Sequence, residues 1–178
     1  MLSRTLILHG LYGNTDDHWQ TLLYEELSRQ GVPVAYPQLP GKDAPVLDEW
    51  LAVFNDLVGE FRPDVLVCHS LGVVLTLHAL DRNPEYRFRK IAFIAPPAFN
   101  QPIDEASTFF PVPGMKIADR AGDVLFVASD NDPWCPFAES ARMGSVLGVK
   151  VERLPGRGHI NPQAGFGPWP DMISWVLG

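Results

Sequence analysis

The sequence is poor in cysteine and in basic charge. Its 178 residues include two cysteines, Cys68 and Cys135, which are too few for a disulfide framework and lack the spacing of metal ligands. We therefore expect no metal site. Lys and Arg number 14 against 21 Asp and Glu, which gives a formal net charge of −7. Because no basic cluster is available to neutralise phosphates, nucleic acid is not expected as a partner.

Long hydrophobic runs are missing too. The first ten residues contain only the short apolar run 6–8, which is too short for the hydrophobic region of a signal peptide or for a membrane span. We expect a cytoplasmic protein that does not contact membranes. The length and the 46 % of hydrophobic residues are ordinary for one globular domain, here residues 1–178.

Short apolar runs alternate with amphipathic segments along the chain. Strands are predicted at 5–8, 32–36, 65–67, 91–94, 124–127 and 149–154. Helices are predicted at 19–27, with Thr15 as the N-cap, and at 46–58, 71–80, 137–147 and 172–177. This alternation is typical of an α/β fold with a parallel six-stranded sheet and helices on both faces. Placing the first strand beside the third gives the order 2-1-3-4-5-6.

The connection at 96–120 contains five of the 17 prolines and no convincing helical period. A long irregular connection in a compact domain is usually functional or mobile. Two interpretations stay open. It is a hydrophobic flap that seals one edge of the sheet, or it is a wall of the substrate pocket, since it leaves the carboxyl end of its strand.

The strongest local signal is Val-Leu-Val-Cys-His-Ser-Leu-Gly-Val-Val at 65–74. A buried strand runs into a sharp turn and then into a buried helix, with Ser70 at the apex, which is the context of a nucleophile elbow. Gly72 supplies the small residue that such a turn needs, whereas Cys68 stands where the common motif has glycine. A helix N-cap explains the serine equally well, but it does not explain Gly72.

A serine nucleophile needs a base to accept its proton. Of the five histidines, His159 follows the last predicted strand and so lies at the same edge of the sheet as Ser70. The other four are placed less well. One precedes the serine, one lies about 12 Å along the following helix, and two flank the first loop.

Two carboxylates after the fifth strand compete to orient this base. Asp130 is the nearer to the strand end and suits an Asx turn. Asp132 precedes Pro133, which holds it extended, and we favour it as the acid. The resulting chain order Ser, Asp, His is that of α/β-hydrolases.

Acyl transfer also needs N–H donors for the developing oxyanion. The backbone N–H of Leu71, at the start of a helix, is one candidate. The second is that of Leu11, in a loop that contains Gly10 and Gly13. A phosphate-binding turn is the alternative for this loop, but neither a Walker A sequence nor a complete dinucleotide fingerprint is present.

The predicted walls of the pocket are apolar, and no basic residue is placed to receive an anionic acyl group. Besides Leu11 they comprise Tyr12, Phe109, Phe110, Phe166 and Trp169. Aromatic residues are also normal core material, so each of these assignments competes with a packing role. The sequence therefore favours short-chain carboxylic esters as substrates in an open pocket, followed by small amides or thioesters.

Several motifs occur together in order, namely His9-Gly10-x-x-Gly13, His18-Trp19-Gln20, the elbow at 68–72, Ala95-Pro96, Ser129-x-x-Asp132-Pro133, Gly158-His159-Ile160-Asn161 and the segment 165–170. Over nearly its whole length the chain resembles the small serine hydrolases related to retinoblastoma-binding protein 9. This resemblance implies an α/β-hydrolase without a cap domain, a triad of Ser70, Asp132 and His159, and no cofactor. The retinoblastoma-pocket motif Leu-x-Cys-x-Glu is absent, so that partner is not expected.

Three alternatives stay open at this point. A catalytically weak hydrolase-fold protein could serve as a binding module. A flavodoxin-like nucleotide or flavin binder has a similar alternation of strands and helices. A different reaction, such as that of a lyase, could use the same base and oxyanion donors.

Overall fold

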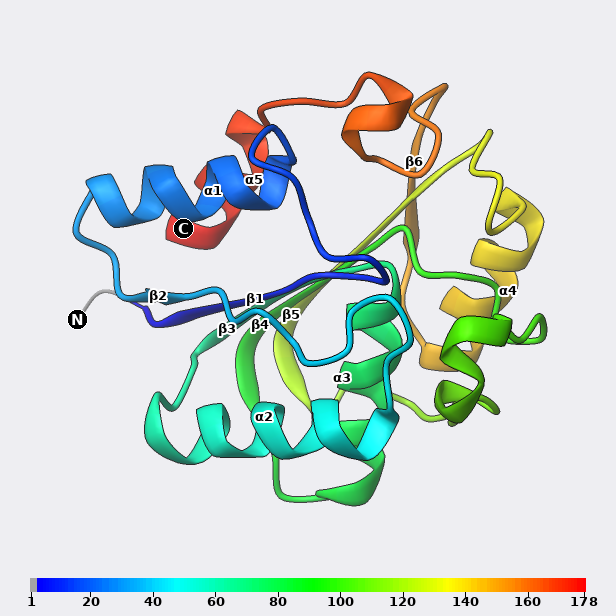
Figure 1. Ribbon diagram of the computed structural model, residues 1–178, viewed down its shortest axis with the longest axis horizontal. Coiled ribbons are helices and arrows are strands. Elements are labelled where there is room, and N and C mark those ends of the chain that lie inside the picture. The colour runs from blue at the N-terminus through cyan, green and yellow to red at the C-terminus, as the bar shows by residue number, and fades with distance from the viewer. Residues whose placement is uncertain (1–2) are drawn as a thin grey trace.

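The computed structural model describes residues 3–178, and its centre is a parallel sheet with the strand order β2-β1-β3-β4-β5-β6 (Figure 1). The strands are β1 (Thr5–Leu8), β2 (Val34–Ala35), β3 (Val65–His69), β4 (Phe88–Ile94), β5 (Ala121–Ser129) and β6 (Val151–Leu154). The predicted order is confirmed. Leu8 of β1 pairs with Cys68 of β3, so the loops that follow these two strands start side by side.

Helices cover both faces of this sheet (Figure 1). They are α1 (Trp19–Arg29), α2 (Leu47–Glu60), α3 (Leu71–Arg82), α4 (Phe137–Leu147) and α5 (Pro170–Leu177). Apolar residues of α1 and α5 share one buried cluster, and those of α2, α3 and α4 share the other. The two clusters lie on opposite faces, because alternate residues of β1 and β3 belong to different clusters.

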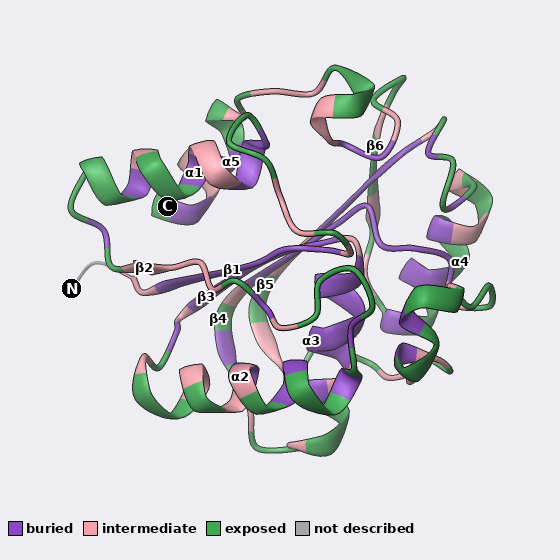
Figure 2. Ribbon diagram, viewed as in Figure 1, coloured by how far each residue is buried: buried purple, intermediate pink, exposed green. Residues whose placement is uncertain are grey.

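Burial is deepest in the central strands and in α3 (Figure 2). All residues of β1 and β3 are buried, which explains their continuous apolar sequences. Helix α3 is apolar on nearly every side because it lies against the sheet and also contacts α2. It begins directly after Ser70, so the most deeply buried helix of the described chain carries the candidate nucleophile at its start.

Two local predictions differ from the structure. The N-cap of α1 is His18, whose Nδ1 accepts a hydrogen bond from the backbone N–H of Gln20. The prediction of Thr15 is wrong, because its hydroxyl bonds to the Asp17 carboxylate instead. The second predicted strand shrinks to two residues.

The connection at 96–120 has one of the two roles that the sequence left open, that of a pocket wall, and its other contacts are with α2 and the core rather than with an edge of the sheet. It contains a short 3-10 helix, η1 (Asp104–Phe109), whose Phe109 is fully buried. Its ring packs edge-on against Trp50 of α2 at 5.1 Å. Two other residues of this connection, Pro97 and Ile103, reach the cavity described below. One part is therefore a core plug and another is a wall.

No helix in the described part of the chain is both long and apolar enough to cross a bilayer. Residues 3–178 also contain no group of three or more His, Cys, Asp or Glu side chains arranged to hold a metal ion.

Candidate active site

Ser70 lies at the tip of the turn between β3 and α3 with φ 53° and ψ −122°. A positive φ at a residue other than glycine costs on the order of 1–3 kcal/mol, and this conformation persists only where the surroundings impose it. Here the backbone N–H of Ser70 donates to the carbonyl of Ile94 at 2.9 Å, and its carbonyl accepts from Val73 at 3.0 Å. The turn is thus fixed between the end of β4 and the first turn of α3, as a nucleophile elbow requires.

Two glycines make this turn possible. A Cβ on Gly72 would lie 2.7 Å from the carbonyl oxygen of Leu8, and one on Gly10 would lie 2.6 Å from the Cβ of Ser70. Both distances are shorter than a real Cβ contact, so β1 and the loop after it approach the elbow too closely for any side chain at these two positions. Cys68 is accommodated, with its thiol 3.1 Å from the hydroxyl of Thr76. Besides Gly72, the residue that lies closest to the turn and has to be a glycine is therefore Gly10, and not the residue at position 68.

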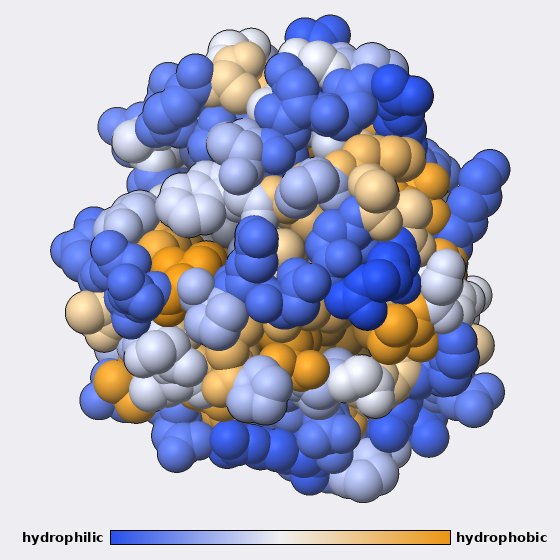
Figure 3. Space-filling model, turned by 90° about the vertical axis from the view of Figure 1, so that its right-hand side faces the viewer, coloured by the Kyte–Doolittle hydropathy of each residue, from blue (hydrophilic) through white to orange (hydrophobic). Residues whose placement is uncertain are grey.

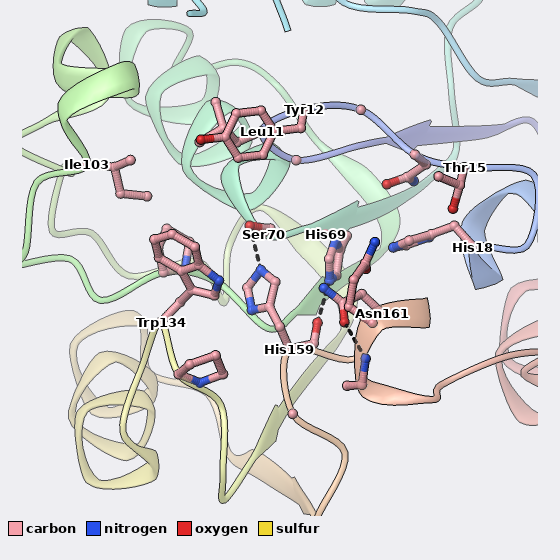
Figure 4. Close-up of a pocket in the computed structure, with 18 residues that line it drawn as sticks. Leu11, Tyr12, Thr15, His18, His69, Ser70, Ile103, Trp134, His159 and Asn161 are labelled. Atoms are coloured by element: carbon pink, nitrogen blue, oxygen red, sulfur yellow. Dashed lines mark hydrogen bonds between the residues drawn. The ribbon is translucent and has the colours of Figure 1, made fainter. Parts of the chain in front are cut away.

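Ser70, His159 and Asp132 form a continuous hydrogen-bonded relay. The Ser70 hydroxyl lies 2.9 Å from Nε2 of His159 (Figure 4). Nδ1 of His159 lies 2.9 and 3.0 Å from the two carboxylate oxygens of Asp132. Because a carboxylate only accepts hydrogen bonds, Nδ1 carries the proton. Nε2 is then free to accept a proton from the serine hydroxyl.

Asp130 faces away from this relay. Its carboxylate accepts hydrogen bonds from Arg153 at 2.9 Å and from the backbone N–H of Gly156 at 2.7 Å. These contacts, the Gly156 bond first, hold the pKa of Asp130 below its usual range. The structure thus brings the acid that we favoured, Asp132, to His159 and gives Asp130 a role in fixing the neighbouring chain.

The segment 155–161, which we call the base loop, is fixed on one side by the β5–α4 loop. The backbone N–H groups of Gly156, Arg157 and Gly158 donate to the side chains of Asp130, Ser129 and Asn131, at 2.7, 2.9 and 2.7 Å. Three successive donors are therefore paired before the chain reaches the histidine.

Two buried donors fix the base loop from the other side. Nε2 of His69 lies 2.9 Å from the carbonyl oxygen of His159, and the indole N–H of Trp19 donates to the carbonyl of Ile160 at 2.9 Å. Since a carbonyl only accepts, Nε2 of His69 carries a proton. Burial holds the pKa of His69 well below its ordinary value, so this side chain is a neutral donor at pH 7.

The segment 9–14, which we call the oxyanion loop, faces the elbow from the end of β1. His9 is buried, with its Nε2 accepting from the N–H of Leu39 at 3.0 Å and its Nδ1 2.7 Å from the carbonyl oxygen of Gly10. A trans peptide directs its N–H opposite to its carbonyl. Because His9 holds the Gly10 carbonyl, the Leu11 N–H points away from His9.

An exposed lysine clasps the far end of the oxyanion loop. The N–H of Tyr12 donates to the backbone carbonyl of Lys42 at 2.7 Å, and the Lys42 ammonium donates back to the Tyr12 carbonyl at 3.1 Å. Tyr12 has φ 69°, a conformation that is uncommon for a large residue. The paired contacts explain how it is maintained.

A cavity of about 540 Å³ opens above Ser70. On this face of the molecule apolar surface gathers between hydrophilic borders (Figure 3). The lining residues include the predicted Leu11 and Tyr12 together with Asn14, Thr15, His18, Pro97, Ile103, Pro133, Trp134, Asn161 and Gln163. Asp, Glu, Lys and Arg are all missing from the wall that residues 3–178 provide. The cavity is therefore uncharged around its nucleophile.

The other four aromatic residues predicted for the pocket lie outside this cavity. Phe109 and Phe110 pack into the core cluster on the α2 face. Phe166 and Trp169 form an edge-to-face pair at 5.1 Å. Trp169 also packs on Trp19 at 5.2 Å. These rings hold peripheral segments to the core, which is the competing role that aromatic composition alone could not exclude.

Several residues at the site were not predicted. Trp134 and Ile103 supply apolar walls, His18 and Asn161 supply polar ones, and His69 supports the base loop. Trp134 had a usable signal, because it follows Asp132-Pro133 at the carboxyl end of a strand. The role of His69 had none, since its partner is a backbone carbonyl 90 residues away.

The strand order, the strained serine turn and the helices on both faces define an α/β-hydrolase fold without an inserted cap. The model of one protein family matches residues 5–177, and that family is described as serine hydrolase. The chain therefore belongs to the serine hydrolase family. Membership decides against the flavodoxin-like alternative, while the narrower relationship to retinoblastoma-binding protein 9 stays a prediction.

Solved structures agree on the fold. The ydeN gene product of B. subtilis superposes with a TM-score of 0.82 at 22 % identity, covering 98 % of this chain and 96 % of that one. A YdeN-like protein of Pectobacterium atrosepticum gives 0.76 at 21 %, covering 99 % and 89 %. The monoacylglycerol lipase of Paleococcus ferrophilus gives 0.66 at 16 %, covering 97 % and 93 %. No curated protein matches the sequence.

Proposed function

We propose that this hydrolase cleaves small carboxylic esters, and by the same route small amides or thioesters, through an acyl-enzyme on Ser70. The observation that carries the proposal is the unbroken relay from the Ser70 hydroxyl through His159 to Asp132, at 2.9 Å and 2.9 Å. The relay opens into an uncharged cavity. Structural, non-catalytic hydrogen bonds would not also require a strained serine at the end of a buried strand.

In the first half-reaction Ser70 Oγ attacks the carbonyl carbon while its proton passes to Nε2 of His159. Asp132 stabilises the imidazolium and keeps its Nδ1 proton in place. When the tetrahedral intermediate collapses, the bond to the leaving oxygen breaks and Nε2 returns the proton to it. Water then attacks the acyl-enzyme with the same base, and the acid product leaves with Ser70 regenerated.

The negative charge on the substrate oxygen is stabilised by the backbone N–H groups of Leu11 and Leu71. The Leu71 N–H opens a helix, where no intrahelical acceptor exists, and the Leu11 N–H is oriented by the His9 contact to Gly10. Gly10 lies against both the serine and the Leu71 nitrogen. Loss of one such donor typically costs about 10²–10³ in kcat.

The test is covalent labelling of the native protein with a fluorophosphonate, which reacts with activated serines only, together with hydrolysis of nitrophenyl acetate. We expect one label, located at Ser70 by peptide mass, and steady turnover. Ser70→Ala should lose both, and Ser145→Ala, which removes an exposed serine hydroxyl on α4, should keep the label. A folded protein that takes no label would contradict the proposal. Labelling without turnover on any ester would favour the binding-module alternative.

A further inference from the structure

The cavity above Ser70 has two chemically different sides. The apolar lining residues, which we call the apolar arm, are Leu11, Tyr12, Pro97, Ile103, Pro133 and Trp134; the polar ones, which we call the polar arm, are Asn14, Thr15, His18, Asn161 and Gln163. In Figure 4, Ile103 and Trp134 lie to one side of the Ser70–His159 pair, and Thr15, His18 and Asn161 lie to the other. When a substrate carbonyl lies at Ser70, the substrate groups on the two sides of the scissile bond therefore enter different arms.

The hydrogen bonds already made in the polar arm show what it can still offer. Nδ1 of His18 accepts from the Gln20 N–H at 3.2 Å, so the neutral ring carries its proton on Nε2. No side-chain or backbone acceptor for that proton is found in residues 3–178. Asn161 uses its Oδ1 to accept from the Ala164 N–H at 3.1 Å, which leaves its amide NH₂ free. The group that remains on each of His18 and Asn161 is a donor.

These donors are uncharged. Burial, followed by the neighbouring His159, lowers the pKa of His18 to about 4, so its ring is neutral at pH 7. Since no charged side chain lines the cavity in the described chain, an ionised substrate group would enter without a counter-charge. Such burial of an unpaired charge is costly. A hydroxyl or amide oxygen, by contrast, matches neutral N–H donors.

The apolar arm is limited in length. Beyond Ile103 and Trp134 the surface continues into a shallow hollow bordered by Gln101, Asp104 and Glu105. A long alkyl chain would leave the apolar walls and meet two carboxylates in water. A chain of short to medium length, by contrast, is covered by Ile103 and Trp134.

Building on the proposed function, we propose that the substrate is an uncharged ester with two unlike halves. A short or medium apolar group on one side of the scissile bond occupies the apolar arm. A group carrying a hydroxyl or amide oxygen on the other side accepts hydrogen bonds from His18 and Asn161 in the polar arm.

The experiment compares esters that differ only by a hydroxyl in place of a methyl. Hydroxyethyl hexanoate is paired with propyl hexanoate, and hexyl hydroxyacetate with hexyl propanoate, so that the polar group is tested on the alcohol side and on the acyl side. We expect kcat/KM to favour the hydroxyl ester by about tenfold or more in one pair, as for a site that donates hydrogen bonds to its substrate. Equal rates, or a preference for the methyl ester in both pairs, would overturn the proposal.

Two serine substitutions then separate the arms. In His18→Ser the new hydroxyl still caps α1, but the ring donor is lost, so the hydroxyl preference should fall toward unity while the preference for hexanoate over acetate esters persists. Ile103→Ser should lower the preference for hexanoate over acetate esters and leave the hydroxyl preference unchanged. Both readouts are ratios within one variant, so a general loss of activity does not affect them. If His18→Ser fails to fold, Asn161→Ser serves the same purpose.

Failure of this inference is distinguishable from failure of the proposed function. A protein that takes the fluorophosphonate and turns over nitrophenyl acetate, yet shows no hydroxyl preference, retains its hydrolase mechanism and refutes the two arms. A hydroxyl preference that His18→Ser and Asn161→Ser both leave unchanged refutes the assignment of the donors. A protein without label or turnover contradicts both proposals at once.

Discussion

The base loop and the oxyanion loop meet at Ser70, yet they are held in different ways. In the base loop, one backbone group of each of the five residues 156–160 is paired with a side chain of 129–131 or with a buried ring. The oxyanion loop is held by the buried His9, by the exposed Lys42 and by Asn14, whose amide donates to the side chains of Gln20 and Tyr36.

The difference follows what each loop has to position. Proton transfer depends on a side chain with rotatable bonds, so His159 needs its backbone fixed and its ring held by Asp132. An oxyanion donor is a backbone N–H, and it is fixed once its own peptide plane is fixed. His9 does this through the Gly10 carbonyl alone. We therefore expect perturbations of the acid–base side to affect activity most.

The largest expected loss of activity is that of Asp132→Asn, and Asp130→Asn, two residues away, is its matched control. The amide at 132 cannot stabilise the imidazolium and favours the wrong tautomer of His159, so kcat should fall about 10³–10⁴-fold. At 130 the amide still accepts from the Gly156 N–H and loses only the ion pair with Arg153. An exposed ion pair is worth about 1 kcal/mol or less, so the loss should stay below about tenfold. Similar losses in steady-state assays of the two variants would contradict our choice of acid.

The sequence predicted the fold and the relay well because both depend on local patterns. Continuous apolar runs such as 65–69 mark strands that are buried on both faces, and the carboxyl ends of parallel strands share one edge of the sheet. Ser70 and Asp132 follow such strands, whereas His159 follows β6, whose residues are partly buried or exposed. Their convergence could therefore be inferred without any knowledge of side-chain packing.

The pocket could not be predicted in the same way. Phe109 and Trp134 are both aromatic residues in loops, yet one is fully buried and the other is 45 % exposed at the cavity. The sequence next to Trp134 places it at the carboxyl end of a strand, but nothing near Phe109 shows that it is buried, because its burial depends on the helix that lies opposite. The polar arm was missed for a related reason. His18 was judged by its place before a helix, whereas its function depends on which ring nitrogen the Gln20 N–H engages.

The second prediction concerns the dependence of the free energy of unfolding on pH. His18 lies at the junction of the two loops, and burial lowers its pKa from 6.5 to about 4 in the folded state. The unfolded chain then binds more protons between these values, so the free energy of unfolding is complete above pH 6.5 and declines as the pH falls toward 4. The full shift corresponds to about 3 kcal/mol. Urea unfolding at pH 7.5 and pH 5 should show a large part of this loss.

The control for the pH effect is His18→Asn, because asparagine caps helices well and does not titrate. Its stability should depend less on pH than that of the wild-type protein in the same urea experiment. The remaining dependence should come from His9, His69 and His78, whose pKa values burial also lowers. An unchanged slope in His18→Asn would show that the buried ring is not the group that links stability to pH.

The smallest expected effect concerns the exposed clasp of the oxyanion loop, Lys42→Met. The substitution keeps the length of the side chain, which packs near Gly13, but removes the hydrogen bond to the Tyr12 carbonyl. The matched control is Lys116→Met, since Lys116 also donates to a backbone carbonyl, that of Ser145 at 2.7 Å, but lies outside the cavity wall. An exposed hydrogen bond contributes about 1 kcal/mol, so the loss of activity at 42 should be a few-fold.

The pattern of the loss decides whether Lys42 positions the oxyanion loop or only stabilises the fold. Oxyanion stabilisation acts in the transition state, so kcat should fall while KM changes little, and Lys42→Arg should restore most of it by donating to the same carbonyl. Lys116→Met should leave both constants unchanged. If the two methionine variants behave alike, or if Lys42→Met raises KM alone, the clasp has no part in holding the Leu11 N–H. In that case the buried His9 contact is sufficient to hold the Leu11 N–H. The oxyanion loop would then depend on a buried contact, as the base loop does.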